Sequence, residues 1–265
     1  MMNKLLLGRY IPGNSIVHRM DPASKILLSL FFVFIIFFAN NVITYVILAI
    51  LALGAVIVSK TPLRFFIRGI RPLIWVIVFT VIIQLLFDTS GQVVFKWAFI
   101  TITNHGLQTA GFIFLRFVLI IFFSTVLTLT TDPLSIAAGI EKLLMPLKRV
   151  KFPVYTVSLM ISIALRFVPT LMDEADTIIK AQSSRGVNFK EGGLFTRAKK
   201  MVPILIPLFI SSFKHAEGLG RAMEARGYQD GDNRTRYHIY KMTSLDWYTW
   251  LVFILIGILV MLLRR

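Results

Sequence analysis

The sequence predicts an all-α integral membrane protein with about five transmembrane helices and two or three long amphipathic helices in the cytoplasm or at the membrane interface. Of its 265 residues, 56% are hydrophobic and only 16% are charged, and the mean hydropathy is +0.75. An ordinary soluble domain is about 45–50% apolar. The apolar residues form long blocks and the charged residues gather between them, which is the pattern of membrane-spanning segments.

Five apolar blocks are long enough, or nearly so, to cross a bilayer, for which about 20 residues are needed. The first two are separated only by Asn40 and Asn41, which predicts a tight hairpin. The last begins with Trp247, and aromatic rings favour the level of the lipid headgroups. The five predicted spans are Ile26–Ala39, Val42–Val58, Pro72–Phe87, Leu107–Leu129 and Trp247–Leu263.

The distribution of Lys and Arg predicts which segments face the cytoplasm. Of the 29 basic residues, 17 lie between Asp132 and Lys241. The N-terminal stretch and the segment after the second span carry four each, whereas the loops after the first and third spans carry none and one. We therefore expect the N-terminus and residues 132–243 in the cytoplasm, with Asn40–Asn41 and the polar loop 88–105 outside.

These counts divide the chain into three predicted regions. Residues 1–131 form an N-terminal membrane domain with four spans, residues 132–243 form a charged cytoplasmic region, and residues 244–265 form the last span. Five spans from a cytoplasmic start place Arg264 and Arg265 outside, where they reach headgroups. The alternative is an additional crossing within 153–213, which makes the number of spans even.

The charged region contains two long amphipathic helices. Apolar residues recur every three or four positions over Val154–Ile179, which predicts a helix of about 30 residues that ends at Gly186. A second helix is expected over Arg197–Arg226, with Gly227 after it, and a shorter one over Pro133–Leu147 precedes both. The prolines expected to kink the long helices are Pro169, Pro203 and Pro207.

Both long helices end in a small residue followed by Arg and Gly, 41 residues apart. The two motifs are Ser184-Arg185-Gly186 and Ala225-Arg226-Gly227. One interpretation is ordinary helix capping, since Arg suits the last turn and Gly the position after it. The other is docking, because an Arg at a helix tip pairs bidentately with carboxylates and Gly permits close backbone approach. Two such tips suit two homologous or identical partners.

Signatures of catalysis, cofactors and metals are absent from the sequence. It has no cysteine, no phosphate-binding G-x-x-x-x-G-K-[ST] loop and no H-E-x-x-H motif. We therefore expect no catalytic, cofactor-binding or metal-binding residues, and the basic balance suits anionic lipid rather than nucleic acid. Asp173, Glu174 and Asp176 lie close together on a polar helix face, which is typical of a solvated surface; a metal or acid–base site is the alternative.

Arg116 is the single charge within the fourth predicted span. A charge at membrane depth is a candidate for function. Two interpretations stay open: Arg116 contacts a partner or a water-filled cleft, or it pairs with a polar group inside the bundle.

Three stretches carry a resemblance to a known family. They are His18-Arg19-Met20-Asp21-Pro22 with Lys25, Arg166-Phe167-Val168-Pro169 leading to Ala181–Gly186, and Ala222–Tyr228. With them, the chain resembles over its whole length EcfT, the transmembrane T component of energy-coupling factor (ECF) transporters for vitamins and micronutrients. The family's Ala-Arg-Gly motif is matched at Ala225-Arg226-Gly227, while Ser184 replaces Ala in the first copy.

The resemblance implies a scaffold subunit of an ATP-driven importer of the ABC type in the cell membrane. Two ABC-type ATPases would dock on the two Arg-tipped coupling helices and would bind ATP and Mg, so that this chain binds no cofactor and is no enzyme. Their closure would tilt a membrane S component that binds the substrate. Two other classes remain as alternatives: the substrate-translocating permease of a conventional ABC importer, and an intramembrane enzyme.

Overall fold

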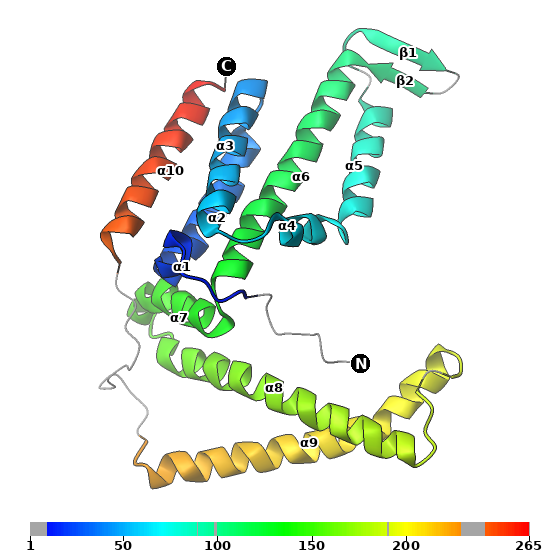
Figure 1. Ribbon diagram of the computed structural model, residues 1–265, viewed down its shortest axis with the longest axis vertical. Helices are drawn as coiled ribbons and strands as arrows, with labels where there is room; N and C mark the ends of the chain where they lie inside the picture. The colour runs from blue at the N-terminus through cyan, green and yellow to red at the C-terminus, as the bar shows by residue number, and fades with distance from the viewer. Residues whose placement is uncertain (1–9, 89, 98–99, 190, 229–241, 265) are drawn as a thin grey trace. The chain divides into compact units, whose positions relative to one another are not determined.

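The chain folds into two compact units. The computed structural model describes residues 10–88, 90–97, 100–189, 191–228 and 242–264 (Figure 1). The bundle unit takes in Gly8–Lys142 and His238–Arg265, and the crossed-helix unit takes in Leu143–Tyr237. By packing, Pro133–Lys142 therefore belongs to the bundle. The predicted division at 131/132 and 243/244 concerns function and stays a prediction.

The bundle unit is organised around one long helix, α6. Its elements are α1 (Ile16–Arg19), α2 (Pro22–Phe38), α3 (Val42–Ser59), α4 (Leu63–Ile70), α5 (Ile74–Phe87), β1 (Val93–Trp97), β2 (Ile100–Thr103), α6 (Asn104–Thr130), most of α7 (Pro133–Leu144) and α10 (Ser244–Leu262). Helices α2, α3, α4 and α5 all pack against α6. Phe123 of α6 stacks on Phe32 with ring centroids 4.4 Å apart and meets Phe253 of α10 edge-on at 5.6 Å. These rings join three helices into one core.

The structure confirms an all-helical membrane architecture, with one small β-hairpin added. By length and composition, four helices can cross a membrane: α3, α6, α10 and α8 (Val154–Ser184). They become five if α4 and α5, which meet at a 57° bend, form one broken span. Helix α2 is apolar but has only 17 residues. The third predicted span thus starts at Ile74 rather than Pro72, because the chain turns over Arg71–Leu73 before α5 begins.

Helices α2 and α10 run parallel within the bundle. At one end, the Asp21 backbone N–H donates to the Asp246 carboxylate at 3.1 Å. At the other end, the Asn41 side-chain amide donates to the Leu263 carbonyl at 3.0 Å, and the Arg264 guanidinium lies 5.3 Å from the Phe38 ring centroid. Helix α2 therefore starts and α10 finishes at opposite ends of the bundle, as an odd number of crossings requires.

A buried polar node holds the first of these ends together. We define it by Asp21, Lys25, Thr130, Thr131, Lys142 and Asp246. Lys25 is 6% exposed, and its ammonium donates to the carbonyls of Thr130 at 3.1 Å and His18 at 3.3 Å. It also donates to the Thr131 hydroxyl at 3.2 Å. All three protons of the buried cation are thereby matched with oxygen acceptors, as burial of a charge demands.

The two buried carboxylates of the node cap helices. Asp246 is fully buried and accepts from the backbone N–H and the hydroxyl of Thr243, each at 2.8 Å, which closes a capping box at the start of α10. Asp21 accepts the Ser24 backbone N–H at 3.2 Å at the start of α2 and lies 3.0 Å from the Lys142 ammonium. One node therefore joins α2, α6, α7 and α10.

The polar loop 88–105 contains an antiparallel hairpin that the sequence analysis did not predict. Strand β1 pairs with β2 in the register Lys96↔Thr101 and Trp97↔Ile100. Before the hairpin, Asp88 accepts the Ser90 backbone N–H at 3.2 Å and the Ser90 hydroxyl, and His105 Nδ1 lies 3.2 Å from its carboxylate. The hydrogen bonds from Ser90 lower the pKa of Asp88 to about 2. The β-branched and aromatic residues of both strands were the available signal.

Helix α7 approaches the start of α2 closely at Gly139. A Cβ at Gly139 would lie 3.0 Å from the Ala23 nitrogen and from the Pro22 carbonyl carbon, both backbone atoms that shift only with their helix. We expect Gly139→Ala to destabilise the chain by about 1–3 kcal/mol through overpacking. The matched control is Gly111→Ala on α6, where a Cβ meets nothing within 4 Å and helix propensity favours Ala. Thermal unfolding in detergent measures both, and equal midpoints would contradict the close approach.

Candidate functional site

The first Arg-Gly motif ends helix α8 in a Schellman turn. Gly186 has a φ of +89°, in the left-handed region that favours glycine. Its N–H donates to the Ser183 carbonyl at 3.0 Å, and the Val187 N–H donates to the Gln182 carbonyl at 3.1 Å. This pair of bonds satisfies the last carbonyls of the helix. Arg185 stands at the C-cap with its side chain exposed.

The second motif repeats this geometry at the end of helix α9 (Leu194–Ala225). Gly227 has a φ of +69°, and its N–H donates to the Glu224 carbonyl at 2.9 Å. The Tyr228 N–H donates to the Met223 carbonyl, also at 2.9 Å. Arg226 takes the C-cap position and is exposed. The predicted left-handed glycines after both helices are therefore confirmed.

Both tips are exposed. Among the residues that the structure describes, no carboxylate pairs with Arg185 or Arg226. A Cβ added to Gly186 or Gly227 would meet nothing within 4 Å. Ser184 uses its hydroxyl internally, donating to the Lys180 carbonyl at 3.1 Å, and Ala225 is the last residue of α9. Each tip thus presents an exposed guanidinium, unpaired by any described carboxylate, beside a bare stretch of backbone.

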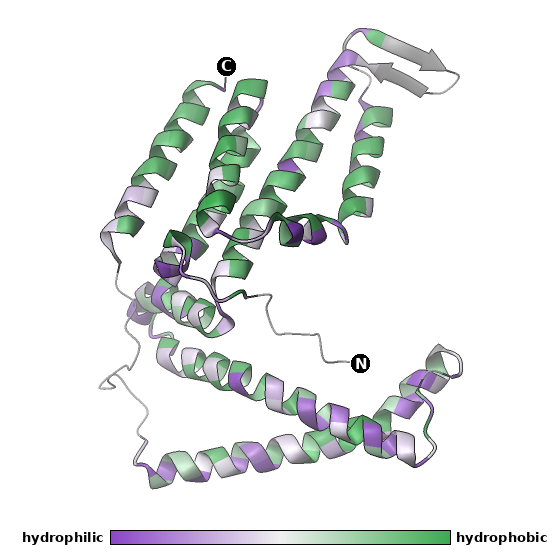
Figure 2. Ribbon diagram, in the orientation of Figure 1, coloured by the Kyte–Doolittle hydropathy of each residue, from purple (hydrophilic) through white to green (hydrophobic). Residues whose placement is uncertain are grey.

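Helices α8 and α9 cross, and their C-terminal ends lie on opposite sides of the crossing (Figure 1). Both helices mix polar and apolar residues along their length, whereas the longer helices of the bundle are largely apolar (Figure 2). Both helices run unbroken through their prolines, Pro169 in α8 and Pro203 and Pro207 in α9. The kinks predicted at these positions stay a prediction. The short helix before α8 ends at Leu144 and continues as a 3-10 turn, η1 (Met145–Val150), because Pro146 interrupts it.

A polar clamp at the crossing was missed by the sequence analysis. The Ser211 hydroxyl of α9 donates to Glu174 Oε1 of α8 at 3.0 Å, and His215 Nε2 lies 3.5 Å from the same oxygen. The His215 ring packs edge-on against Phe167 at 5.7 Å. Glu174 was expected on a solvated face together with Asp173 and Asp176; the structure turns it toward α9. Ser211 and His215, four residues apart on a polar helix, were the available signal.

Arg116 has a partner inside the bundle. Its Nε donates to the Tyr45 hydroxyl at 3.2 Å, and its guanidinium lies 5.2 Å from the centroid of the Phe37 ring. Tyr45 is 2% exposed and stacks on Phe112. These contacts stabilise a charge at membrane depth. A further contact of Arg116 with another protein stays a prediction.

No cluster of three or more His, Asp or Glu that suits a metal ion occurs in the described part of the chain. The three acidic residues of α8 do not converge on one point, because Glu174 faces α9 whereas Asp173 is exposed. What the arrangement offers chemically is two exposed cationic helix tips, held by one crossing.

Comparisons with known proteins agree with this architecture. Residues 13–237 match the CbiQ family, described as cobalt transport protein. The energy-coupling factor transporter transmembrane protein EcfT of Lacticaseibacillus paracasei is 52% identical over 246 residues, 93% of each chain. The EcfT proteins of Streptococcus equi and Bacillus subtilis are 50% and 47% identical, over 99% and 93% of this chain and 98% and 93% of their own.

A membrane bundle linked to two Arg-tipped helices, and similar along its length to transport proteins, defines a transmembrane component of a transporter. More particularly, the chain belongs to the EcfT family, the transmembrane proteins of energy-coupling factor transporters.

The clamp at the crossing is open to a direct test. A hydrogen bond to a charged group contributes about 1.5–3 kcal/mol, so we expect Glu174→Ala to loosen the crossing of α8 and α9. Spin labels at positions 181 and 222, introduced as the only cysteines, report the distance distribution between the helix ends, and we expect it to broaden. Asp173→Asn, an exposed neighbour, is the matched control and leaves the distribution unchanged. An unchanged distribution in Glu174→Ala assigns the clamp no role in fixing the crossing.

Proposed function

We propose that this chain is the scaffold subunit of an ATP-driven ECF-type importer, which couples two cytoplasmic ATPases to a substrate-binding membrane S component for vitamin uptake. The observation that carries the proposal is the duplicated helix end: the same Schellman turn, the same exposed Arg and the same uncovered Gly occur twice in one crossed unit. A capping role alone explains each glycine, but it gives no reason for an exposed Arg at both tips.

The docking step uses the chemistry of the guanidinium. Arg presents a planar fork of donors that pairs bidentately with a carboxylate. Because Arg185 and Arg226 sit at helix tips with nothing over the neighbouring glycines, a groove on each ATPase can enclose the tip and exclude water. Two tips on opposite sides of the crossing suit two ATPase subunits, identical or homologous (Figure 1).

Coupling follows from the length of the helices. Helices α8 and α9 have 31 and 32 residues and share the clamp of Glu174, Ser211 and His215. When the ATPases close on ATP and Mg, which they bind themselves, the tips move and the crossing transmits the displacement. This chain supplies no catalytic group to the reaction and binds no nucleotide, in keeping with its lack of a phosphate-binding loop.

An uncovered apolar surface on α9 suits a membrane partner. Between residues 201 and 213 it exposes Met201, Val202, Leu205, Ile206, Phe209, Ile210 and Phe213. A contiguous apolar surface of this kind is covered by lipid or by another protein in the working complex. In the proposed importer the S component covers it, and tilting of that component carries the substrate across. Arg116, with its Tyr45 partner, is the proposed anchor for any contact deeper in the bundle.

The proposal predicts the behaviour of Arg185→Ala and Arg226→Ala. Truncating an anchor of this kind costs about 2 kcal/mol or more, or about 30-fold in affinity. We expect each single variant to weaken ATPase docking and the double variant to release the ATPases or to uncouple hydrolysis from uptake. The Lys variants recover roughly half of the loss, because Lys keeps the charge without the fork. The measurements are ATPase co-purification and substrate uptake at matched membrane expression.

The control for this experiment is Arg221→Ala, which removes an exposed Arg that pairs with Glu217 one turn before the second tip. We expect Arg221→Ala to leave assembly with the ATPases intact. Wild-type assembly and uptake in the double variant Arg185→Ala/Arg226→Ala would reduce both motifs to helix caps.

The proposed orientation in the membrane has its own test. The Lys and Arg asymmetry places 132–243 and the N-terminus in the cytoplasm. Since the chain has no cysteine, a single Cys at position 184 should resist a membrane-impermeant thiol reagent applied from outside, and a single Cys at Asn41 should react. Reaction of position 184 in sealed cells would overturn the topology. Reaction of both after permeabilisation is the control.

A further inference from the structure

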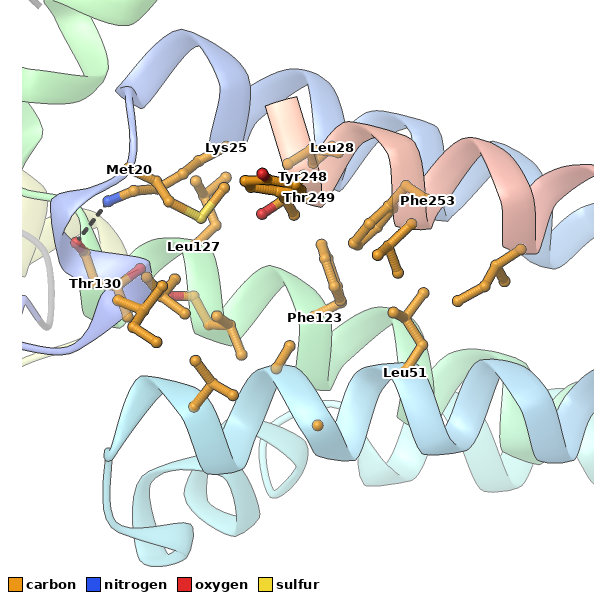
Figure 3. Close-up of a pocket in the computed structure, with 18 of the residues that line it drawn as sticks. Met20, Lys25, Leu28, Leu51, Phe123, Leu127, Thr130, Tyr248, Thr249 and Phe253 are labelled. Atoms are coloured by element: carbon orange, nitrogen blue, oxygen red, sulfur yellow. Dashed lines mark hydrogen bonds between the residues drawn. The ribbon is translucent and has the colours of Figure 1, made fainter. Parts of the chain in front are cut away.

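The bundle unit contains a cavity of about 540 Å³. Residues of α1, α2, α3, α6 and α10 line it, and Figure 3 shows Leu51, Phe123 and Phe253 around it, with Lys25 and Thr130 together at one end. A cavity of about 150 Å³ lined by Leu, Ile and Phe already binds benzene. This one has room for a considerably longer apolar molecule.

The cavity suits hydrocarbon rather than a polar ligand. Its walls are aliphatic and aromatic, with Leu28, Ile50, Leu51, Val126, Val252 and Phe253 among them. Most polar groups in its lining are already used: the Lys25 ammonium and the Thr130 carbonyl bond each other at 3.1 Å, and the Thr249 hydroxyl donates to the Leu245 carbonyl at 2.8 Å, whereas Tyr248, 70% exposed, lies at the open side. A polar ligand would find no unpaired partner among these groups, so the hydrophobic effect favours an apolar occupant.

The cavity is accessible from the surface that faces lipid. Ile50 of α3 and Tyr248 of α10 line it while remaining 65% and 70% exposed. Helices α3 and α10 contact each other. An α-helix is about 10 Å wide and rises about 5.4 Å per turn, so a volume of about 540 Å³ holds little more than one turn of a partner helix, and a single extended chain suits the cavity better.

The end of the cavity at the polar node has a positive rim. Arg19 is the last residue of α1, whose Ile16 and Val17 line the cavity, and Lys60 follows α3 two residues beyond Val58. Arg19 and Lys60 are exposed. The nearby carboxylates of Asp21 and Asp246 are buried and bonded within the node, and that of the half-buried Asp132 accepts the Ser135 backbone N–H at 3.0 Å. The charge at the rim therefore complements an anionic headgroup.

We propose that this cavity binds one acyl chain of an anionic phospholipid from the surrounding bilayer, with its headgroup at Arg19 and Lys60. The site lies within the bundle unit and does not depend on ATPase docking, so it stands or falls separately from the proposed function. The bound chain fills space between α3 and α10 that the protein's own side chains leave open.

Gly54 of α3 offers a direct test. It lines the cavity, and a Cβ there meets nothing within 4 Å, so Gly54→Phe places a ring in the space proposed for the acyl chain. The matched control is Gly111→Phe on α6, whose Cβ is equally unobstructed but lies outside the cavity lining. The full chain is purified in detergent, washed, and analysed for retained phospholipid by native mass spectrometry and by lipid extraction.

We expect the wild type and Gly111→Phe to retain about one phospholipid per chain, and Gly54→Phe to retain about tenfold less, since lost burial of about two methylene groups already corresponds to that factor. The thermal midpoint of Gly54→Phe is measured alongside. Should that variant unfold, Ala55→Leu, a smaller intrusion into the same cavity, replaces it. Equal retention by folded wild type and cavity-filled variants would overturn the proposal, as would a wild type that retains no lipid or binds only a protein in this cavity.

The headgroup is tested in nanodiscs of phosphatidylglycerol mixed with phosphatidylcholine. We expect the wild type to retain phosphatidylglycerol preferentially, and the double variant Arg19→Gln/Lys60→Asn to lose that preference while still retaining one lipid. Asn suits position 60 because the backbone there is left-handed, with a φ of +55°. A preference unchanged by the double variant would overturn the assignment of the headgroup to this rim.

Discussion

The arrangement of the bundle depends on the buried node around Asp21, Lys25 and Asp246. Apolar side chains pack against one another or against lipid with similar ease, so they specify helix positions in a membrane only weakly. Buried charges are different, because each must find its partners or cost several kcal/mol. Lys25 finds them on α1 and at the end of α6, the Asp21 carboxylate finds Lys142 on α7, and the Asp246 carboxylate of α10 accepts the Asp21 backbone N–H. The node thereby fixes which helix ends meet.

The two units fix the positions of their helices in different ways. In the bundle, polar contacts join the helices at both ends, Arg116 pairs with Tyr45 within it, and aromatic rings such as Phe32, Phe123 and Phe253 pack in the core. In the crossed-helix unit a half-buried polar cluster, Glu174 with Ser211 and His215, lies where α8 and α9 cross. Few buried apolar contacts and long exposed helices are features of elements that move readily. This difference suits the proposed function, in which α8 and α9 move with the ATPases while the bundle unit stays in the membrane.

The apolar spans, the amphipathic helices and the helix ends could be predicted from the sequence because their signals are local. Hydrophobic blocks mark spans through their length, and a period of three to four residues marks the amphipathic helices α8 and α9. The helix ends at Gly186 and Gly227 were predicted because a left-handed C-cap involves only neighbouring residues. The β-hairpin was local too, but its short strands were hidden in a segment treated as a polar loop.

What the sequence by itself determined was therefore the class of the protein, its spans, its long helices and the residues at their tips. The tertiary structure decided which distant groups meet: Asp21 with Asp246, Arg116 with Tyr45, and Glu174 with Ser211. It also decided that an apolar space remains between α3 and α10. The physical reason is that a helical period states which face of a helix is apolar, while the partner of a buried polar group is set by how whole helices pack, and these partners lie 225, 71 and 37 residues apart.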